Sequence, residues 1–183
     1  MQGLLKELEL WEVRDDIDLR YFDESGFSQV PNLPYAWTPR GQTLELPAFS
    51  HSRRLNVLGF LSRQGRLTCH ATTGKVTTET VIAAFEQLLA EKSEERPTIV
   101  ILDNAAIHRS RRFQEKRRQW VGRELYVIYL PPYSPELNRI EILWRKMKYE
   151  WLPMEAYRTF ESLCQNVQQV LTDFGEKYQI TFV

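Results

Sequence analysis

The sequence of 183 residues contains only two cysteines, has no long apolar run and lacks the common short catalytic motifs. Cys69 and Cys164 lie too far apart to form a metal motif or a disulfide framework, which favours reduced thiols in the cytoplasm. No stretch approaches the ~20 apolar residues of a membrane helix, and the charged N-terminus lacks the apolar core of a signal peptide. The sequence has no glycine-rich phosphate loop, no GxSxG turn and no cysteine–histidine signature. It therefore lacks the common motifs for nucleotide binding and for hydrolysis through a covalent intermediate.

Charge is balanced, with 24 basic and 24 acidic residues, which argues against a strongly electrostatic nucleic-acid binder. The distribution along the chain is nevertheless uneven. The first 24 residues hold eight acids against three bases, whereas residues 109–118, RSRRFQEKRR, hold six bases and one acid. Residues 139–148 add four bases against one acid. Such patches either contact phosphates or form a solvated helix face, and both interpretations stay open for the basic run alone.

Hydrophobic periodicity predicts one α/β domain in which helices flank a mixed sheet. Residues 17–21 alternate as in a half-buried strand, which we expect to end at Asp23 and to be broken at Ser25-Gly26. The apolar runs 98–102 and 125–130 predict strands buried on both faces. The other expected elements are helices over 2–14, 110–120 and 160–174, a helix from Thr77 or Thr78 through 89, a helix from 138, hairpin strands over 54–62 and 67–71, and turns or short edge pieces over 31–47.

Three carboxylates stand where ligand sites usually form in such a domain. Asp23 and Asp103 each follow a predicted strand, and ligand sites gather at the carboxyl ends of strands. Glu141 lies in the first turn of a helix after a buried strand and a proline-rich loop. Carboxylates that converge repel one another and suit hard cations such as Mg²⁺. Two such ions ~3.5–4 Å apart assist phosphoryl transfer.

Each acid also has a simpler interpretation. Asp23 fits a turn in which it bonds only the backbone, and Asp103 fits a loop acid or a helix cap. Glu141 stands three residues after Asn138, the spacing of a capping box. Further residues stay open: Glu24 and Glu136 as competing carboxylates, and His108 as a core, loop or active-site histidine.

Four sequence strings occur in order along the chain: FDESGF at 22–27, YAWTPRGQ at 35–42, LDNAAIH at 102–108 and LPPYSPELNRIEILWRKMK at 130–148. Together they closely resemble the DDE transposases of the bacterial insertion-sequence and mariner-type superfamily. The resemblance runs from about residue 17 to residue 175. The 37 residues between Asp103 and Glu141 fit the insertion-sequence branch of that family.

This resemblance implies a ribonuclease H-like fold, in agreement with the predicted order of elements. It implies that Asp23, Asp103 and Glu141 are the catalytic, metal-binding triad and hold two Mg²⁺ ions, for which Mn²⁺ substitutes. The implied chemistry is hydrolysis of DNA strands at transposon ends, followed by attack of the freed 3′-hydroxyl on target DNA. The implied partners are these DNAs and a second copy of the chain bound to them, in the cytoplasm with the nucleoid.

The chain departs from the family in one respect, because its first acid stands at residue 23 and leaves no room upstream for helix-turn-helix domains. We therefore expect a single catalytic domain over residues 1–183 and a separate N-terminal DNA-binding portion. The alternatives are a catalytically silent DNA-binding or assembly remnant and another ribonuclease H-like nuclease. We expect DNA phosphates to contact the basic helix through Arg111, Arg112, Lys116, Arg117 or Arg118.

Overall fold

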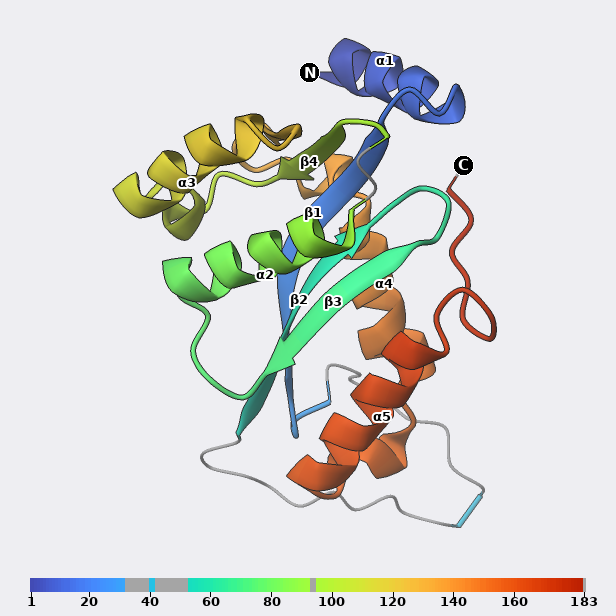
Figure 1. Cartoon of the computed structure of the whole chain (residues 1–183). Coiled ribbons are helices and arrows are strands. Elements are labelled where there is room, and N and C mark those ends of the chain that lie inside the picture. The colour runs from blue at the N-terminus through green and yellow to red at the C-terminus, as the bar shows by residue number, and fades with distance from the viewer. Residues whose placement is uncertain (32–39, 42–52, 93–94, 183) are drawn as a thin grey trace.

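The computed structural model describes residues 1–31, 40–41, 53–92 and 95–182. These residues form a five-stranded sheet with the order β3-β2-β1-β4-β5 (Figure 1). β1, β2 and β3 pair antiparallel, whereas β1, β4 and β5 pair parallel. The predicted mixed sheet is therefore confirmed. Its strands are β1 Asp18–Ser28, β2 Arg54–Leu61, β3 Leu67–Thr72, β4 Thr98–Leu102 and β5 Leu125–Tyr129.

The long strand β1 corrects one prediction, because it does not end at Asp23. It continues through Ser25 and Gly26, and it pairs with β2 from Tyr21 opposite Leu61 to the end of the strand. Continuous cross-strand hydrogen bonding with β2 outweighs the local preference of Ser-Gly for a turn. The expected turn or edge segment over 31–47 lies outside the described residues, except for Pro31 and a turn at 40–41.

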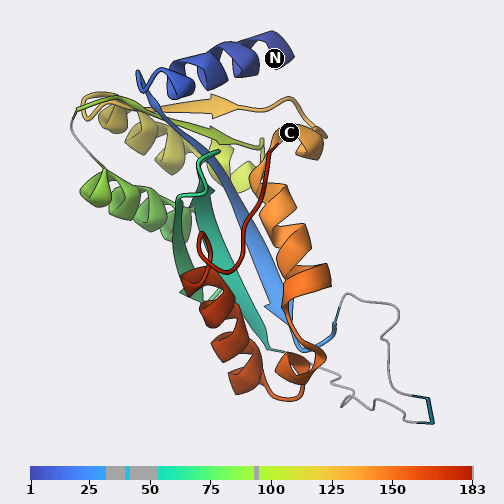
Figure 2. The same ribbon diagram turned by 90° about the vertical axis from the view of Figure 1, so that its right-hand side faces the viewer.

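Helices cover both faces of the sheet (Figures 1 and 2). α2 Thr78–Glu91 and α3 Arg111–Val121 pack on one face, while α1 Gln2–Val13, α4 Ile140–Lys146 and α5 Phe160–Thr172 pack on the other. These helices were all predicted within two or three residues. None of the helices within the described ranges is long and apolar enough to span a membrane.

Local signals set the helix ends as the sequence predicts. Thr77 caps α2 through a capping box, the Ser110 hydroxyl accepts a hydrogen bond from the first turn of α3, and Gly122 follows α3. One feature has no signal in the hydrophobic pattern: α4 continues directly into a π-helical turn, Met147–Trp151. Such turns are rare, and they occur often at functional sites.

Each face of the sheet has its own core. Between the sheet and α2 and α3 the core is aromatic, with the Phe85 and Trp120 rings stacked at 4.8 Å. The other core joins α1, α4 and α5 to the sheet and includes Tyr21, Trp144 and Tyr157. Because neighbouring residues of a strand point to opposite faces, β1 sends Phe22 into the first core and Tyr21 into the second.

Gly59 of β2 sets the distance between α4 and the sheet. A Cβ atom at this position would stand 2.9 Å from the Trp144 ring and 3.1 Å from Ile140. Any larger residue would therefore push α4 outward, since the interior is close-packed. Gly59 pairs with Asp23 across the β1–β2 ladder. This single glycine thus brings the helix that carries Glu141 close to the strand that carries Asp23.

Candidate active site

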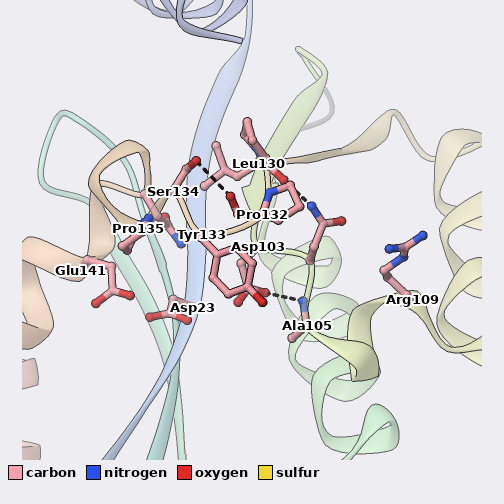
Figure 3. Close-up of a pocket in the computed structure, with 13 residues that line it drawn as sticks. Asp23, Asp103, Ala105, Arg109, Leu130, Pro132, Tyr133, Ser134, Pro135 and Glu141 are labelled. Carbon is pink, nitrogen blue, oxygen red and sulfur yellow. Dashed lines mark hydrogen bonds between the residues drawn. The ribbon is translucent and has the colours of Figure 1, made fainter.

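Three acids predicted from the sequence line one cavity of about 470 Å³. Asp23 comes from the middle of β1, Asp103 from the end of β4 and Glu141 from the first turn of α4. Figure 3 shows their side chains turned toward this space, which Asn138 and residues 130–135 also line. The structure therefore brings the three acids together, and we refer to this space as the carboxylate cavity.

The structure also tests the simpler roles of the three acids as turn, loop or cap residues. Asp23 lies in the middle of β1 and pairs with Gly59 of β2, so its interpretation as a turn residue is wrong. Glu141 does not form a capping box with Asn138, because the Asn138 amide donates instead to the carbonyl oxygen of Phe22 at 3.0 Å. Asp103 does accept a hydrogen bond from the Ala105 backbone N–H at 3.0 Å, as a loop acid would. That bond occupies only one of its oxygens, Oδ1.

The competing carboxylates lie elsewhere. Glu24 follows Asp23 in β1 and therefore points to the opposite face, where its Oε1 contacts the ring of His108 at 2.9 Å. Glu136 does not line the carboxylate cavity but a neighbouring hollow, which shares Asn138 and Glu141 with that cavity. Neither acid therefore replaces a member of the predicted triad.

The carboxylate cavity concentrates negative charge. Burial, together with the nearby charges of Glu141, Glu24 and Asp103, raises the pKa of Asp23 to about 8. Burial and Asp103 also raise the pKa of Glu141, although Lys148 opposes them. The pKa of Asp103, in contrast, is lowered by its hydrogen bond from His108. Because an opposite charge favours the charged form of a carboxyl group, a cation in the cavity would lower the pKa values of Asp23 and Glu141 again.

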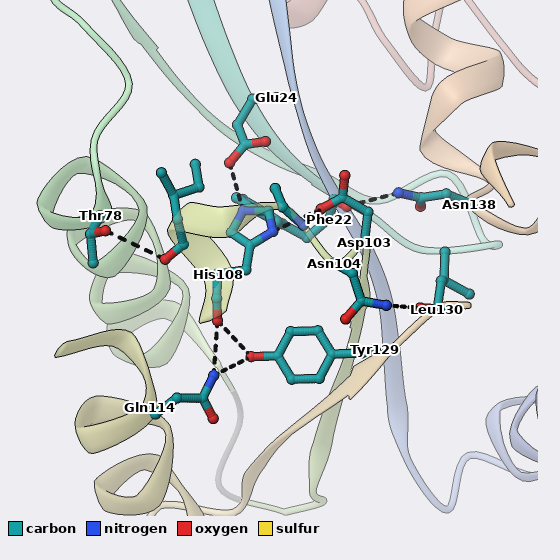
Figure 4. Close-up of polar contacts among 12 residues, drawn as sticks. Phe22, Glu24, Thr78, Asp103, Asn104, His108, Gln114, Tyr129, Leu130 and Asn138 are labelled. Carbon is teal, nitrogen blue, oxygen red and sulfur yellow. Dashed lines mark hydrogen bonds and ion pairs between the residues drawn. The ribbon is translucent and has the colours of Figure 1, made fainter. Parts of the chain in front are cut away.

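The ring of His108 joins Asp103 to Glu24 (Figure 4). Its Nδ1 lies 2.8 Å from Oδ1 of Asp103, and its Nε2 lies 2.9 Å from Oε1 of Glu24. Burial alone would lower the pKa of His108, but the hydrogen bonds and charges of these two carboxylates raise it to about 9. Both open interpretations of His108 hold in part, because the residue is fully buried and also touches the site.

Asn138 presents an acceptor without a partner. Its Oδ1 is buried and has no hydrogen-bond partner within the part of the chain that the structure describes. A buried amide oxygen of this kind calls for a donor such as water. Asn138 reaches the cavity at the end of a loop whose first residue, Leu130, accepts a hydrogen bond from the amide of Asn104, in the segment after β4. At its tip, Tyr133 is fully exposed with a left-handed backbone (φ 56°).

A divalent cation fits the chemistry of this cavity. Its three carboxylates supply oxygen ligands, and Asn138, whose buried amide oxygen has no partner within the described residues, also lines it. Among the described residues, no group of three or more acidic, histidine or cysteine side chains is arranged so that it could hold a metal ion. Mg²⁺ is usually held by only one or two carboxylates and completes its shell with water and substrate phosphate. Asp23, Asp103 and Glu141 are the residues that could hold it.

Two basic residues at this site are not among the candidates that the sequence predicts. Arg109, the first base of the basic run, lines the carboxylate cavity itself. Lys148 is half-buried, and its pKa is lowered by burial and by Arg54, while Glu141 and Asp23 oppose this shift. Lys148 stands seven residues after Glu141, which is two helical turns and hence the same helix face. That spacing is a signal from which it could have been found.

The five predicted DNA contacts on α3 lie on a partly neutralised surface. Arg111 pairs with Glu115, Arg112 with Glu79 and Lys116 with Glu86. The Arg117 guanidinium lies over the ring of Tyr129, and Arg118 is exposed. Exposed ion pairs are worth about 0–1 kcal/mol, so phosphates could displace them. The prediction for these residues stays a prediction.

Comparison with known proteins places this geometry in a family. Residues 18–164 match the family described as DDE superfamily endonuclease. A protein of Shigella sonnei, described as the insertion element IS630 uncharacterized 39 kDa protein, is 28% identical over 128 residues, which are 69% of this chain and 36% of that protein. The chain thus spans about a third of that relative's length.

Solved structures of the Mos1 transposase share the fold. The Mos1 strand transfer complex matches with a TM-score of 0.60 and 16% identity over 94% of this chain and 53% of that chain. The Mos1 mariner paired end complex with Mn matches with a TM-score of 0.62 and 16% identity over 93% and 52%. These likenesses confirm the expected ribonuclease H-like fold. With the family match over most of its length, the chain belongs to the DDE superfamily of endonucleases.

Proposed function

We propose that this chain is the catalytic domain of a transposase, which cleaves DNA strands with the help of divalent metal ions and transfers the freed 3′ ends to target DNA. The observation that carries the proposal is the carboxylate cavity. Asp23, Asp103 and Glu141 come from three distant segments and line one space. Burial and the charges of the neighbouring acids raise the pKa of Asp23 to about 8, and strongly shifted pKa values of this kind cluster at functional sites.

The proposed roles of the residues follow from their positions. Asp23 is fixed in the sheet and Asp103 is fixed by His108, so these two aspartates offer a rigid base for Mg²⁺. Glu141 faces them from α4 and completes the oxygen set. When bound, two metal ions would activate the attacking oxygen and stabilise the leaving oxygen of a phosphodiester. Asn138 also lines the cavity, and its buried, unpartnered amide oxygen would accept a hydrogen bond from a water or hydroxyl there.

DNA is the proposed substrate. Arg109 lines the cavity beside the carboxylates, and Lys148 lies next to Glu141, so both can meet the phosphates on either side of a scissile bond. The α3 surface would extend this contact. The Mos1 neighbours were solved as complexes of transposition, which supports DNA ends and target as partners. A second copy on DNA and a separate N-terminal DNA-binding portion belong to the same proposal.

Cleavage of supercoiled plasmid DNA tests this function. We expect nicking by the wild-type chain with Mg²⁺ or Mn²⁺ and none in EDTA, and a loss of at least roughly 100-fold for Asp103→Asn, since one ligand of the essential ion is removed. Glu136→Gln is the matched control, because Glu136 is an acid of the same region outside the carboxylate cavity. Equal nicking by wild type and Asp103→Asn would refute the assignment.

Two other outcomes would point to other functions. Salt-sensitive DNA retention without any metal-dependent cleavage would identify a silent binding remnant. Preferential cleavage of an RNA–DNA hybrid or a DNA junction in a substrate panel would identify a different ribonuclease H-like nuclease. We expect neither, because the triad is complete and lines an open cavity next to basic residues.

A further inference from the structure

The ring of His108 makes two polar contacts, one to Asp103, which lines the carboxylate cavity, and one to Glu24, which points to the opposite face of the sheet. Its Nδ1 donates to Oδ1 of Asp103 at 2.8 Å and its Nε2 donates to Oε1 of Glu24 at 2.9 Å. The side chain is 1% exposed, so water does not compete for either nitrogen. The bridge joins β1 to the end of β4, and Glu24 and His108 stand 84 residues apart in the sequence (Figure 4).

The ring has little freedom to move. It packs against Phe22 and Phe113 at centroid distances of 5.7 Å and 5.9 Å. The His108 carbonyl oxygen is held as well, because it accepts hydrogen bonds from the Tyr129 hydroxyl at 2.7 Å and from the Gln114 amide at 2.9 Å. Strand β5 and helix α3 therefore fix the backbone of His108, and the aromatic core fixes its ring.

Stability alone does not account for this arrangement. A buried polar network often contributes no more to stability than well-packed apolar side chains of similar volume. The surroundings of His108 are aromatic, so a phenylalanine would suit the core there as well. What the imidazole adds is a fixed donor to Asp103, whose side chain is otherwise 52% exposed at the end of β4. Without that donor, only the Ala105 backbone N–H would hold the carboxylate.

We infer that His108, anchored by Glu24, is a positioning residue that fixes the Asp103 carboxylate for metal binding. Oδ1 of Asp103 is occupied by His108 and by the Ala105 backbone N–H, so Oδ2 is the oxygen left for a cation in the cavity. Groups that orient metal ligands typically contribute 10–100-fold to metal affinity. The inference rests on the proposed function, since it concerns the same metal site.

Two substitutions of one residue separate positioning from mere core filling. The amide nitrogen of asparagine stands as many bonds from Cα as Nδ1 of histidine, whereas the longer glutamine places its nitrogen near Nε2. His108→Asn should therefore keep the donor to Asp103, and His108→Gln should keep only the contact with Glu24. We expect His108→Gln to weaken Mn²⁺ binding by about 10–100-fold and His108→Asn to weaken it by no more than a third of that factor.

The measurement is a Mn²⁺ titration of the full chain at fixed pH, followed by electron paramagnetic resonance of the free ion, with Mn²⁺-dependent nicking measured in parallel. Thermal unfolding shows that each variant is folded. If both His108 variants bind Mn²⁺ as the wild type does, or if both lose binding equally, the inference is overturned. A metal-binding difference without a matching difference in melting temperature supports it, because a filler residue would change stability alone.

A second pair of variants covers the possibility that neither His108 variant folds. Glu24→Gln keeps an oxygen that accepts from Nε2, while Glu24→Met has a similar length and no such acceptor. We expect Glu24→Met to weaken Mn²⁺ binding at least threefold more than Glu24→Gln, and equal binding by this pair would overturn the inference. Asp103→Asn distinguishes the two levels of failure. If it binds Mn²⁺ as the wild type does, the proposed function fails; if it loses binding while all other variants retain it, only the inference fails.

Discussion

Replacing Asp23 with asparagine should stabilise the metal-free protein while abolishing its cleavage of DNA. Burial and the charges of Glu141 and Glu24 raise the pKa of Asp23 from 3.8 to about 8. Between these two pH values the folded chain binds a proton that the unfolded chain has released. The free energy of unfolding therefore falls as the pH rises from about 4 to about 8. Asparagine cannot ionise, so the variant escapes this loss.

The size of the effect follows from the same shift. Each tenfold change in proton affinity corresponds to about 1.4 kcal/mol, so the full shift sets an upper limit of about 6 kcal/mol. Asp23 is partly exposed, and solvent screening reduces the gain to roughly 2 kcal/mol. For a chain of this size 1 kcal/mol moves the melting temperature by about 2–4 °C. We therefore expect Asp23→Asn to melt roughly 4–8 °C above the wild type at pH 8.

Thermal unfolding followed by circular dichroism tests this at pH 5, 6.5 and 8 in EDTA. The gap between Asp23→Asn and the wild type should be small at pH 5 and largest at pH 8. Saturating Mg²⁺ should narrow it, because the ion binds and stabilises the folded wild type. Glu136→Gln serves as the control for the loss of one acid. A gap that stays constant with pH, or a variant less stable than the wild type at pH 8, would refute the electrostatic reasoning.

Further predictions concern the support of the site and its contact with DNA. Gly59→Ala should lower the free energy of unfolding, measured by chemical denaturation, by about 1–3 kcal/mol, because the added methyl group would meet the Trp144 ring. The same substitution should reduce nicking. Unchanged nicking would show that α4 need not lie so close to the sheet. Arg118→Gln should weaken DNA binding uniformly and lower the salt slope by about one, whereas Lys177→Gln, in the C-terminal segment, should change neither. Lys148→Gln should raise the dissociation constant for DNA in a filter-binding assay and still allow Mn²⁺ to bind; loss of metal binding instead would assign Lys148 to the support of Glu141.

Much of the fold follows from the sequence, because its elements carry strong local signals. The run at 98–102 is apolar and β-branched and becomes the fully buried β4. Thr77, one of the two residues from which α2 is predicted to start, caps that helix, and α3 begins within one residue of its predicted start. The length of β1 did not follow, since local preference favoured a turn at Ser25-Gly26 while the hydrogen bonds that extend the strand come from β2. Pairing between distant segments is not visible in a window of neighbouring residues.

The three acids that line the carboxylate cavity could be predicted from the sequence, whereas the side chains that contact them could not. Asp23, Asp103 and Glu141 were found through the ordered strings of the family, and the cavity brings them together. The contact of His108 with Glu24 joins residues 84 positions apart, so no local pattern encodes it. The basic run on α3 was visible, but its pairing with acids of α2 depends on how the two helices pack, which the sequence does not state.

The most direct test of the central claim is a crystal structure of the chain grown with Mn²⁺ and measured for anomalous scattering. The claim is that Asp23, Asp103 and Glu141 form one metal-binding site. It predicts an anomalous peak in the carboxylate cavity with oxygens of Asp23 and Asp103 within about 2.0–2.3 Å, and Glu141 at this ion or at a second one. Manganese bound only elsewhere, or no peak in the cavity at saturating Mn²⁺, would contradict the claim.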